Sequence, residues 1–227
     1  MKVQRKMDRT FTLNMTQTNP QHGENMAIGL IAFVHLVGVV GMLSPLREFF
    51  QTLTPYNLIF SALVIGMVEK ERTQSLLWVL LGSFVAGYLV EVAGVATGSI
   101  FGEYSYGETL GFKLFDVPLV IGLNWALLVF CTGNITSRLP INNSLKAAAA
   151  AALMTGLDFL IEPVAIALDF WSWESVAVPI QNYIAWFLIA SVMLRAFHAI
   201  NRTSVNRVAV GVFVAQAVLF GLLWALL

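Results

Sequence analysis

Residues 91–118, EVAGVATGSIFGEYSYGETLGFKLFDVP, combine the end of an apolar helix with a polar, aromatic loop. The apolar run carries one carboxylate, Glu91, and ends at two glycines, Gly94 and Gly98. Pro118 starts the next apolar run, because proline is tolerated in the first helical turn, where its missing N–H would have no partner. The loop between the two runs holds several polar and aromatic residues, among them Glu103, Tyr104, Tyr106, Glu108 and Asp116. Most of the remaining chain is apolar, so these residues are the exception to explain.

The composition is that of a membrane protein. Of 227 residues, 58% are hydrophobic and only 11% are charged, with a mean hydropathy of +0.76. These values lie far from those of soluble domains. The net charge is zero, and no basic patch with interleaved aromatic residues suggests nucleic-acid binding. The single cysteine, Cys131, can form no intrachain disulfide and therefore does not indicate a redox compartment.

Seven apolar segments are long enough to cross a bilayer, which takes about 20 residues in a helix. They are residues 26–43, 49–68, 75–97, 117–135, 145–168, 177–198 and 208–227. The second segment is the weakest. Its first half contains Gln51, Thr54, Pro55 and Asn57. We therefore predict an all-α, polytopic membrane bundle of about seven transmembrane helices, with a polar cytoplasmic tail (1–25) before a single transmembrane domain (26–227).

The distribution of lysine and arginine predicts the orientation of the bundle. These residues are retained on the cytoplasmic side of a membrane. Eleven of them lie in the tail and in the loops on its side, whereas the alternate loops contain only Arg47 and Lys113. The amino terminus is therefore predicted to be cytoplasmic and the carboxyl terminus external. The tail has no early apolar core and does not resemble a cleaved signal peptide.

In this topology, polar side chains of four helices fall at a similar depth. Counting about 1.5 Å per residue, four of them lie about 8 to 10 Å below the outer rim: Glu91, Asn124, Glu162 and Asn182. Asp158 lies one turn deeper. Acidic residues of two loops are predicted to close over this layer: Glu103, Glu108, Asp116, Asp169 and Glu174.

Three carboxyl groups in the layer, those of Glu91, Asp158 and Glu162, are costly to bury. Each costs about 2.5 to 3.5 kcal/mol near mid-membrane on insertion scales, and no lysine or arginine shares their depth. Desolvation without a cation favours a neutral acid, so at least one should hold a proton at neutral pH. Asp158 and Glu162 share a helix face, and Pro163 can bend the helix beside them. The structural alternative is that these acids only join helices through hydrogen bonds to asparagine or tryptophan.

Aromatic side chains gather at the same level. They are Tyr104, Tyr106, Trp125, Trp171, Trp173, Tyr183 and Trp186. Trp125 and Trp186 lie close to the asparagines along their helices and are predicted pocket walls, where aromatic faces also stabilise cations. Trp171 and Trp173 instead fit the aromatic belt that forms at membrane interfaces.

Several functional classes lack residues that they require. Three histidines without helical spacing argue against a membrane di-iron oxygenase or desaturase, and no metal site is predicted. His35 is expected to be packed or hydrogen-bonded. The last helix has no lysine for a retinal Schiff base, and DFLIE at 158–162 is at best half of the two acidic sites that a prenyltransferase needs. No Gly-rich phosphate loop or Ser-His-Asp order is present.

Four segments together resemble the carotenoid biosynthesis protein family of polytopic membrane proteins. They are residues 91–118, Asn124-Trp125, TGLDFLIEPVA at 155–165 and VPIQNYIAWF at 178–187. The resemblance covers roughly residues 77–197. It implies that water is added across the terminal double bond of an acyclic carotenoid end, without a cofactor, in the cytoplasmic membrane of a prokaryote. The implied partners are the lipid bilayer and a carotenoid substrate, with other membrane enzymes of the pathway as further candidates.

The polar layer fits acid-catalysed hydration of an alkene. Protonation of the less substituted carbon leaves a tertiary carbocation, which needs stabilising surroundings and a water molecule held by a base. We predict Asp158, the deepest acid, as the proton donor, with Glu162 or Glu91 as the base. The predicted substrate-binding residues are Asn124, Trp125, Asn182, Trp186, Tyr104, Tyr106 and Asp116.

Two other functions compete with this prediction. A proton-coupled transporter also keeps acids within the membrane, but transporters often have inverted repeats with broken helices in matching halves, which this sequence lacks. A non-catalytic membrane subunit could instead present a carotenoid to partner enzymes. Substitution of Asp158 by asparagine separates these classes, because only a hydratase would lose alcohol formation while staying folded.

Overall fold

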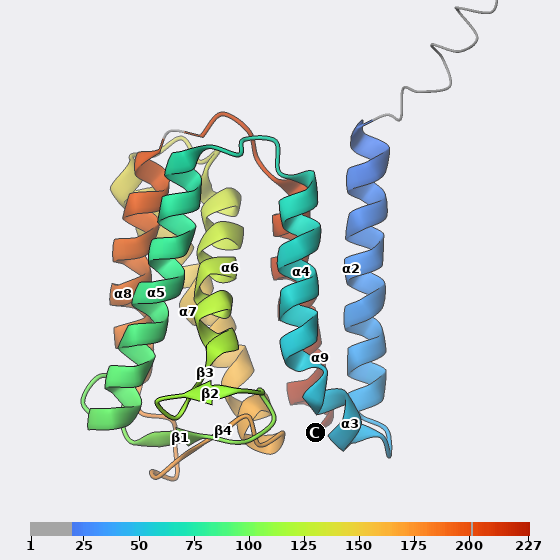
Figure 1. Ribbon diagram of the computed structural model, residues 1–227, viewed down its shortest axis with the longest axis vertical. Coiled ribbons are helices and arrows are strands. Elements are labelled where there is room, and N and C mark those ends of the chain that lie inside the picture. The colour runs from blue at the N-terminus through green and yellow to red at the C-terminus, as the bar shows by residue number, and fades with distance from the viewer. Residues whose placement is uncertain (1–19, 201) are drawn as a thin grey trace, which may run out of the picture.

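The computed structural model describes residues 20–200 and 202–227, which form a bundle of helices with short strands at one end (Figure 1). The helices are α2 (Pro20–Met42), α3 (Arg47–Thr52), α4 (Thr54–Val68), α5 (Gln74–Thr97), α6 (Leu119–Thr136), α7 (Asn143–Ala167), α8 (Ile180–Ala199) and α9 (Arg207–Leu226). The strands are β1 (Tyr104–Tyr106), β2 (Lys113–Leu114), β3 (Val117–Pro118) and β4 (Trp171–Trp173).

Six of the described helices are long and apolar enough to cross a membrane: α2, α5, α6, α7, α8 and α9. The prediction of an all-α, polytopic membrane bundle is therefore confirmed, while its orientation stays a prediction. Within the predicted span 49–68, the chain breaks at Leu53 into α3 and the 15-residue α4. A helix of that length is about 22 Å long, less than the roughly 30 Å of a hydrocarbon core. The prediction of about seven spans therefore exceeds by one the six candidate spans among the described residues.

The start of the bundle also differs from the prediction. Helix α2 begins at Pro20, so the last six residues assigned to the tail are helical. The first nineteen residues of the predicted tail lie outside the described part of the chain.

Side-chain caps explain where three of the helices begin. Thr73 Oγ1 accepts the Leu76 amide at 3.2 Å before α5, and Asn142 Oδ1 accepts the Leu145 amide at 3.0 Å before α7. Asn206 caps α9 in the same way. Such caps satisfy backbone donors that have no partner within the first helical turn.

Helix α6 is the centre of the bundle, because 78% of its membrane-length window is buried, more than for any other candidate span. It contacts α5, α7, α8 and α9 as well as the short α4. Helix α2 packs against α9 at the other side of the bundle, and α4 lies close to both (Figure 1). The alanine-rich part of α7 is buried, with Ala150 and Ala151 fully enclosed, as suits close helix packing by small residues.

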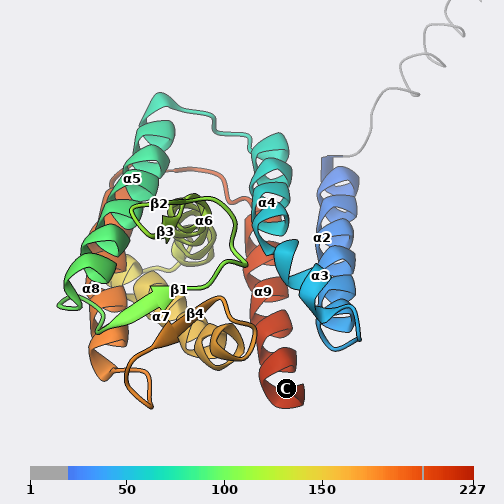
Figure 2. The same cartoon turned by 60° about the horizontal axis from the view of Figure 1, so that its bottom comes forward.

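The strands lie across the ends of α6 and α7 (Figure 2). Strand β1, with the sequence YSY, pairs antiparallel with β4, with the sequence WSW, so that each tyrosine lies opposite a tryptophan. Side chains alternate between the two faces of a strand. The tyrosines and tryptophans therefore share one half-buried face, while Ser105 and Ser172 are exposed on the other. The short strands β2 and β3 form a second antiparallel pair.

Two glycines allow the loop after α5 to fold back onto the bundle. Gly98 ends α5 with a φ of 63°, a left-handed conformation that suits glycine. A Cβ atom on Gly94 would lie 2.6 Å from Cδ2 of Phe101, so this glycine makes room for the loop.

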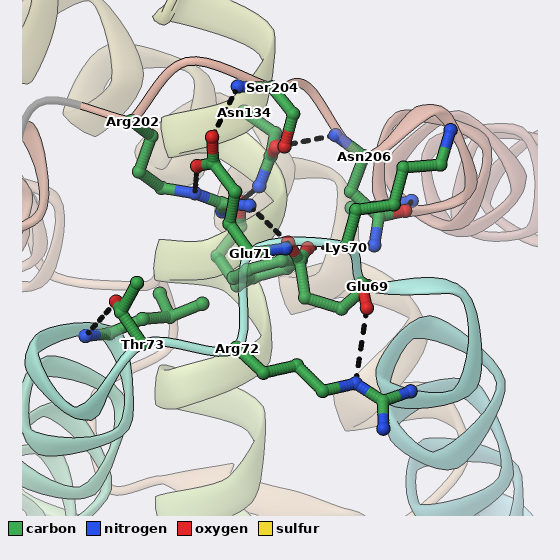
Figure 3. Close-up of polar contacts among 12 residues, drawn as sticks. Glu69, Lys70, Glu71, Arg72, Thr73, Asn134, Arg202, Ser204 and Asn206 are labelled. Atoms are coloured by element: carbon green, nitrogen blue, oxygen red, sulfur yellow. Dashed lines mark hydrogen bonds and ion pairs between the residues drawn. The ribbon is translucent and has the colours of Figure 1, made fainter.

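The opposite end of the bundle is joined by an ion-pair network (Figure 3). Arg202, which follows α8, donates from Nη2 to Oε1 of Glu69 at 2.6 Å and from Nε to Oε2 of Glu71 at 3.4 Å. The side chains of Arg202 and Glu69 are only 5% and 7% exposed. Asn206 donates from Nδ2 to Oε2 of Glu69 at 3.0 Å, and its backbone amide donates to Oδ1 of Asn134 at 2.8 Å. The network ties the α4–α5 loop to the α8–α9 loop.

Candidate functional site

Glu91, Asp158 and Glu162 line one cavity of about 40 Å³ at the strand-bearing end of the bundle. Their exposed fractions are 3%, 2% and 2%. The other polar or aromatic residues of the wall are Phe101, Tyr104, Tyr106, Asn124, Trp171, Trp173, Asn182 and Trp186. Helices α5, α6, α7 and α8 and both strands of the β1–β4 pair contribute to this wall. The structure thus brings together the three acids that the sequence placed in one layer.

Glu91 receives three hydrogen bonds from neutral donors. The hydroxyls of Tyr104 and Tyr106 donate to its Oε2 at 2.6 and 2.8 Å, and the indole Nε1 of Trp125 donates to Oε1 at 3.0 Å. Glu91 forms no ion pair with a described residue. An indole N–H can only donate, so this environment suits a carboxylate that accepts hydrogen bonds.

Glu162 has a similar set of donors. The indoles of Trp171 and Trp173 donate to its Oε2 at 3.0 and 2.8 Å, and Asn182 Nδ2 lies 3.3 Å from its Oε1. The same amide donates to Oδ2 of Asp158 at 2.8 Å. Asn182 therefore bridges the two acids of α7.

Asp158 differs from the other two acids in its donors. Among the described side chains, Asn182 is the one that donates to it, whereas Glu91 and Glu162 each receive three donors. A carboxyl group with few donors gains least from being ionised. Of the three acids, Asp158 is thus the best placed to hold the transferable proton.

We call Tyr104, Tyr106, Trp171 and Trp173 the aromatic lid. The β1–β4 register brings the Tyr104 ring within 5.1 Å of Trp173 and the Tyr106 ring within 6.0 Å of Trp171, measured between centroids. Burial, together with the nearby Glu91, raises the pKa of both tyrosines well above its ordinary value. The lid thus presents neutral O–H and N–H donors to the acids.

A second aromatic wall comes from α6 and α8. The rings of Trp125 and Trp186 stack with centroids 4.2 Å apart and an interplanar angle of 17°. Trp186 and Asn124 line the cavity, whereas Trp125 is fully buried behind it and holds Glu91. Asn124, Trp186, Asn182, Tyr104 and Tyr106 line the cavity, whereas the prediction that Trp125 is a pocket wall was wrong.

Two sequence predictions about this region were wrong. Asp116 lies in the exposed turn between β2 and β3, with a φ of 63°, and does not line the cavity. Trp171 and Trp173, predicted as an interfacial belt, donate to Glu162 instead. The matching alternation of YSY and WSW was the signal that could have identified them, because both patterns place two aromatic residues on one face.

The acidic loop residues do not face the site either. Glu103, Glu108, Asp169 and Glu174 are exposed, and Glu108 pairs with Lys113 at 2.8 Å on the surface. The loops close over the cavity as predicted, but with aromatic side chains inward and carboxylates outward.

The cavity has room for water but not for a carotenoid end. About 10 to 15 Å³ holds one water molecule, whereas a benzene-sized molecule needs about 150 Å³. A hydrocarbon end can therefore enter only when the surrounding side chains move. Within the described part of the chain, no three His, Cys, Asp or Glu side chains are grouped so that they could hold a metal ion.

The family model for carotenoid biosynthesis proteins matches residues 53–227, which include every residue of the cavity. The chain belongs to the carotenoid biosynthesis protein family. Bisanhydrobacterioruberin hydratase of Haloarcula japonica is 27% identical to this family member over 187 residues. The alignment covers 71% of the present chain and 61% of the hydratase, so the chain spans less than two thirds of that relative. No solved structure matches this carotenoid biosynthesis protein.

Proposed function

We propose that this protein is a cofactor-independent hydratase that adds water to the terminal double bond of an acyclic carotenoid end, giving a tertiary alcohol. The observation that carries the proposal is the set of three buried acids around one small polar cavity, held by neutral donors rather than by cations. The similarity to a hydratase supports the same reaction class.

In the proposed reaction, Asp158 transfers its proton to the less substituted carbon of the double bond. The π electrons form the new C–H bond, and a tertiary carbocation remains at the neighbouring carbon. Trp186 lines the cavity with Trp125 stacked behind it, so the Trp186 ring can stabilise that cation. Water then forms the C–O bond to the cation.

The captured water must lose a proton to complete the alcohol, and we assign this proton to Glu162. Glu162 and Asp158 are linked through the Asn182 amide, which lies 3.3 Å from one and 2.8 Å from the other. Proton return from Glu162 to Asp158 restores the starting state, so the net reaction consumes one water. Glu91, which receives three donors, holds the Tyr104 and Tyr106 side of the cavity in place.

The test is pigment analysis after expression in a host that accumulates lycopene or γ-carotene. Mass spectrometry of the wild type should show a gain of one water per reacted end. Asp158→Asn should lose this product while the protein remains folded and membrane-inserted. Glu108→Gln is the matched control, because the Glu108 side chain is 93% exposed and outside the cavity. Unchanged pigments after substitution of all three acids would exclude catalysis by this cavity.

A further inference from the structure

A second cavity, of about 140 Å³, lies between α2, α3, α4 and α9, and the hydration proposal does not use it. Most of its lining is apolar, including Met42, Phe50 and Phe220. Its polar side chains are His35, Thr54, Asn57 and Gln216. Gln216 is 5% exposed and is the one polar residue of α9 after Arg207.

The contacts of His35 fix the donors and acceptors in this cavity. His35 Nδ1 lies 2.8 Å from the backbone oxygen of Ile31, so it donates there, and its Nε2 is an acceptor in the neutral ring. Asn57 Nδ2 lies 3.4 Å from that Nε2 and donates to it. His35 is therefore hydrogen-bonded, as the sequence predicted, and the Asn57 amide is oriented with its oxygen away from the ring.

Three buried oxygen atoms of the cavity residues lack a hydrogen-bond partner among the described residues. They are Thr54 Oγ1, Asn57 Oδ1 and Gln216 Oε1. A buried amide oxygen without a donor is destabilising, and in lipid no bulk water can supply one. A ligand that carries a hydrogen-bond donor would therefore satisfy these oxygen atoms.

The size and lining of the cavity restrict what can supply this donor. Its volume is close to the roughly 150 Å³ of a cavity that holds a benzene-sized molecule. Thr54, Asn57 and Gln216 are uncharged, and the His35 ring is neutral in the tautomer described above. Among the described residues, the cavity lining therefore contains no carboxylate that could balance the charge of a cationic ligand. A small hydrocarbon end that carries a neutral hydroxyl group fits both the volume of the cavity and its uncharged lining.

An apolar groove next to this cavity can hold a long hydrocarbon chain attached to such an end. His35 and Leu219 line this cavity and also an apolar groove of about 470 Å³ between α2 and α9. Exposed side chains such as Val214 and Val218 line that groove. Phe170 lines the second cavity and the next residue, Trp171 of the aromatic lid, lines the first, so adjacent residues of the chain contribute to the two cavities.

We propose that this second cavity binds the hydroxyl-bearing end of a long-chain alcohol dissolved in the bilayer. The hydroxyl donates to Gln216 Oε1, and the hydrocarbon chain extends along the α2–α9 groove. This binding requires no hydration chemistry and goes beyond the proposed function.

The test uses the full chain in nanodiscs and tritium-labelled farnesol as the probe. We expect saturable binding that unlabelled farnesol displaces and that the hydrocarbon farnesene displaces at least about tenfold less effectively, since the hydrocarbon lacks the hydrogen bond. Absence of saturable binding, or equal competition by farnesene, would overturn the proposal.

Substitution of Gln216 by leucine separates a ligand site from a structural role. We expect farnesol binding to weaken at least about tenfold, while the unliganded Tm is unchanged or higher, because an unpaired buried amide is replaced by an apolar group of similar size. Ser191→Ala is the control, since Ser191 Oγ donates within α8 to Phe187, and it should bind normally.

A second variant keeps the test decisive if Gln216→Leu does not fold. A Cβ atom on Gly38 would lie 3.6 Å from Leu219 Cδ1, an ordinary contact, so Gly38→Leu can project into the cavity and fill it. We expect this variant to lose farnesol binding. Wild-type affinity in either folded variant would overturn the assignment.

Discussion

Buried carboxyl groups occur at both ends of this bundle, and the two ends differ in what surrounds them. At one end, Glu69 faces Arg202 at 2.6 Å. At the other, Glu91, Asp158 and Glu162 receive hydrogen bonds from phenols, indoles and one amide, and form no ion pair with a described residue.

This difference separates two uses of a buried acid. An arginine fixes its partner in the ionised state, because the guanidinium stays charged. Neutral donors impose no such charge requirement, so a carboxyl group among them can give up and regain a proton. The network of Arg202 therefore suits the joining of loops, whereas the cavity of the three acids suits proton transfer.

Replacing Glu162 by glutamine should have the largest effect. The amide keeps the size of the side chain but cannot take a proton, so hydration should fall by about 10²- to 10⁴-fold, the usual contribution of a general base. Product yield per folded protein, measured by mass spectrometry, checks this. A near-normal yield would contradict the role of Glu162 and would indicate that Glu91 is the base.

Replacing Arg202 by methionine should instead damage stability. Removal of one partner of a buried ion pair leaves an uncompensated charge and costs about 3 to 5 kcal/mol. We expect a clear fall in Tm in detergent. Lys70→Met is the control, since the Lys70 side chain is 60% exposed in its pair with Glu24 and such pairs contribute at most about 1 kcal/mol. Equal shifts in the two variants would contradict a structural role specific to Arg202.

Replacing Trp173 by phenylalanine tests the aromatic lid with a smaller expected effect. The change keeps an aromatic ring but removes the indole donor that lies 2.8 Å from Oε2 of Glu162. Loss of one hydrogen bond to a charged group costs about 1.5 to 3 kcal/mol, so hydration should fall at least about tenfold. Ser172→Ala, on the exposed face of β4, should leave activity unchanged.

Acidification should weaken the network at the opposite end by a small amount. The hydroxyl and backbone amide of Thr203, the Ser204 amide and Arg202 donate to Glu71 and hold its pKa below the ordinary value of 4.5. A lowered pKa means that this stabilisation is present above pH 4.5 and is lost as pH falls through the lower value. The Tm of the wild type should therefore fall more steeply below pH 4.5 than that of Glu71→Gln. Parallel curves would contradict this.

Much of the architecture was readable from the sequence. Long apolar runs predicted the membrane bundle, since hydrophobicity over about 20 residues is a local property. Counting residues along each helix also placed Glu91, Glu162 and Asn182 at one level and Asp158 one turn deeper, because the rise per residue of a helix is constant. Gly98 marked the end of α5 for an equally local reason.

Only the tertiary structure decided which side chains face the acids. The pairing of Tyr104 with Trp173 joins segments that lie far apart in the chain, and no local pattern specifies such a register. That register turned Trp171 and Trp173 inward, whereas Asp116, in the turn between β2 and β3, and the other loop carboxylates lie outside the cavity. Strand pairing and side-chain alternation, which depend on contacts between distant segments, thus determined the wall of the cavity, whereas local hydrophobicity determined the helices that carry it.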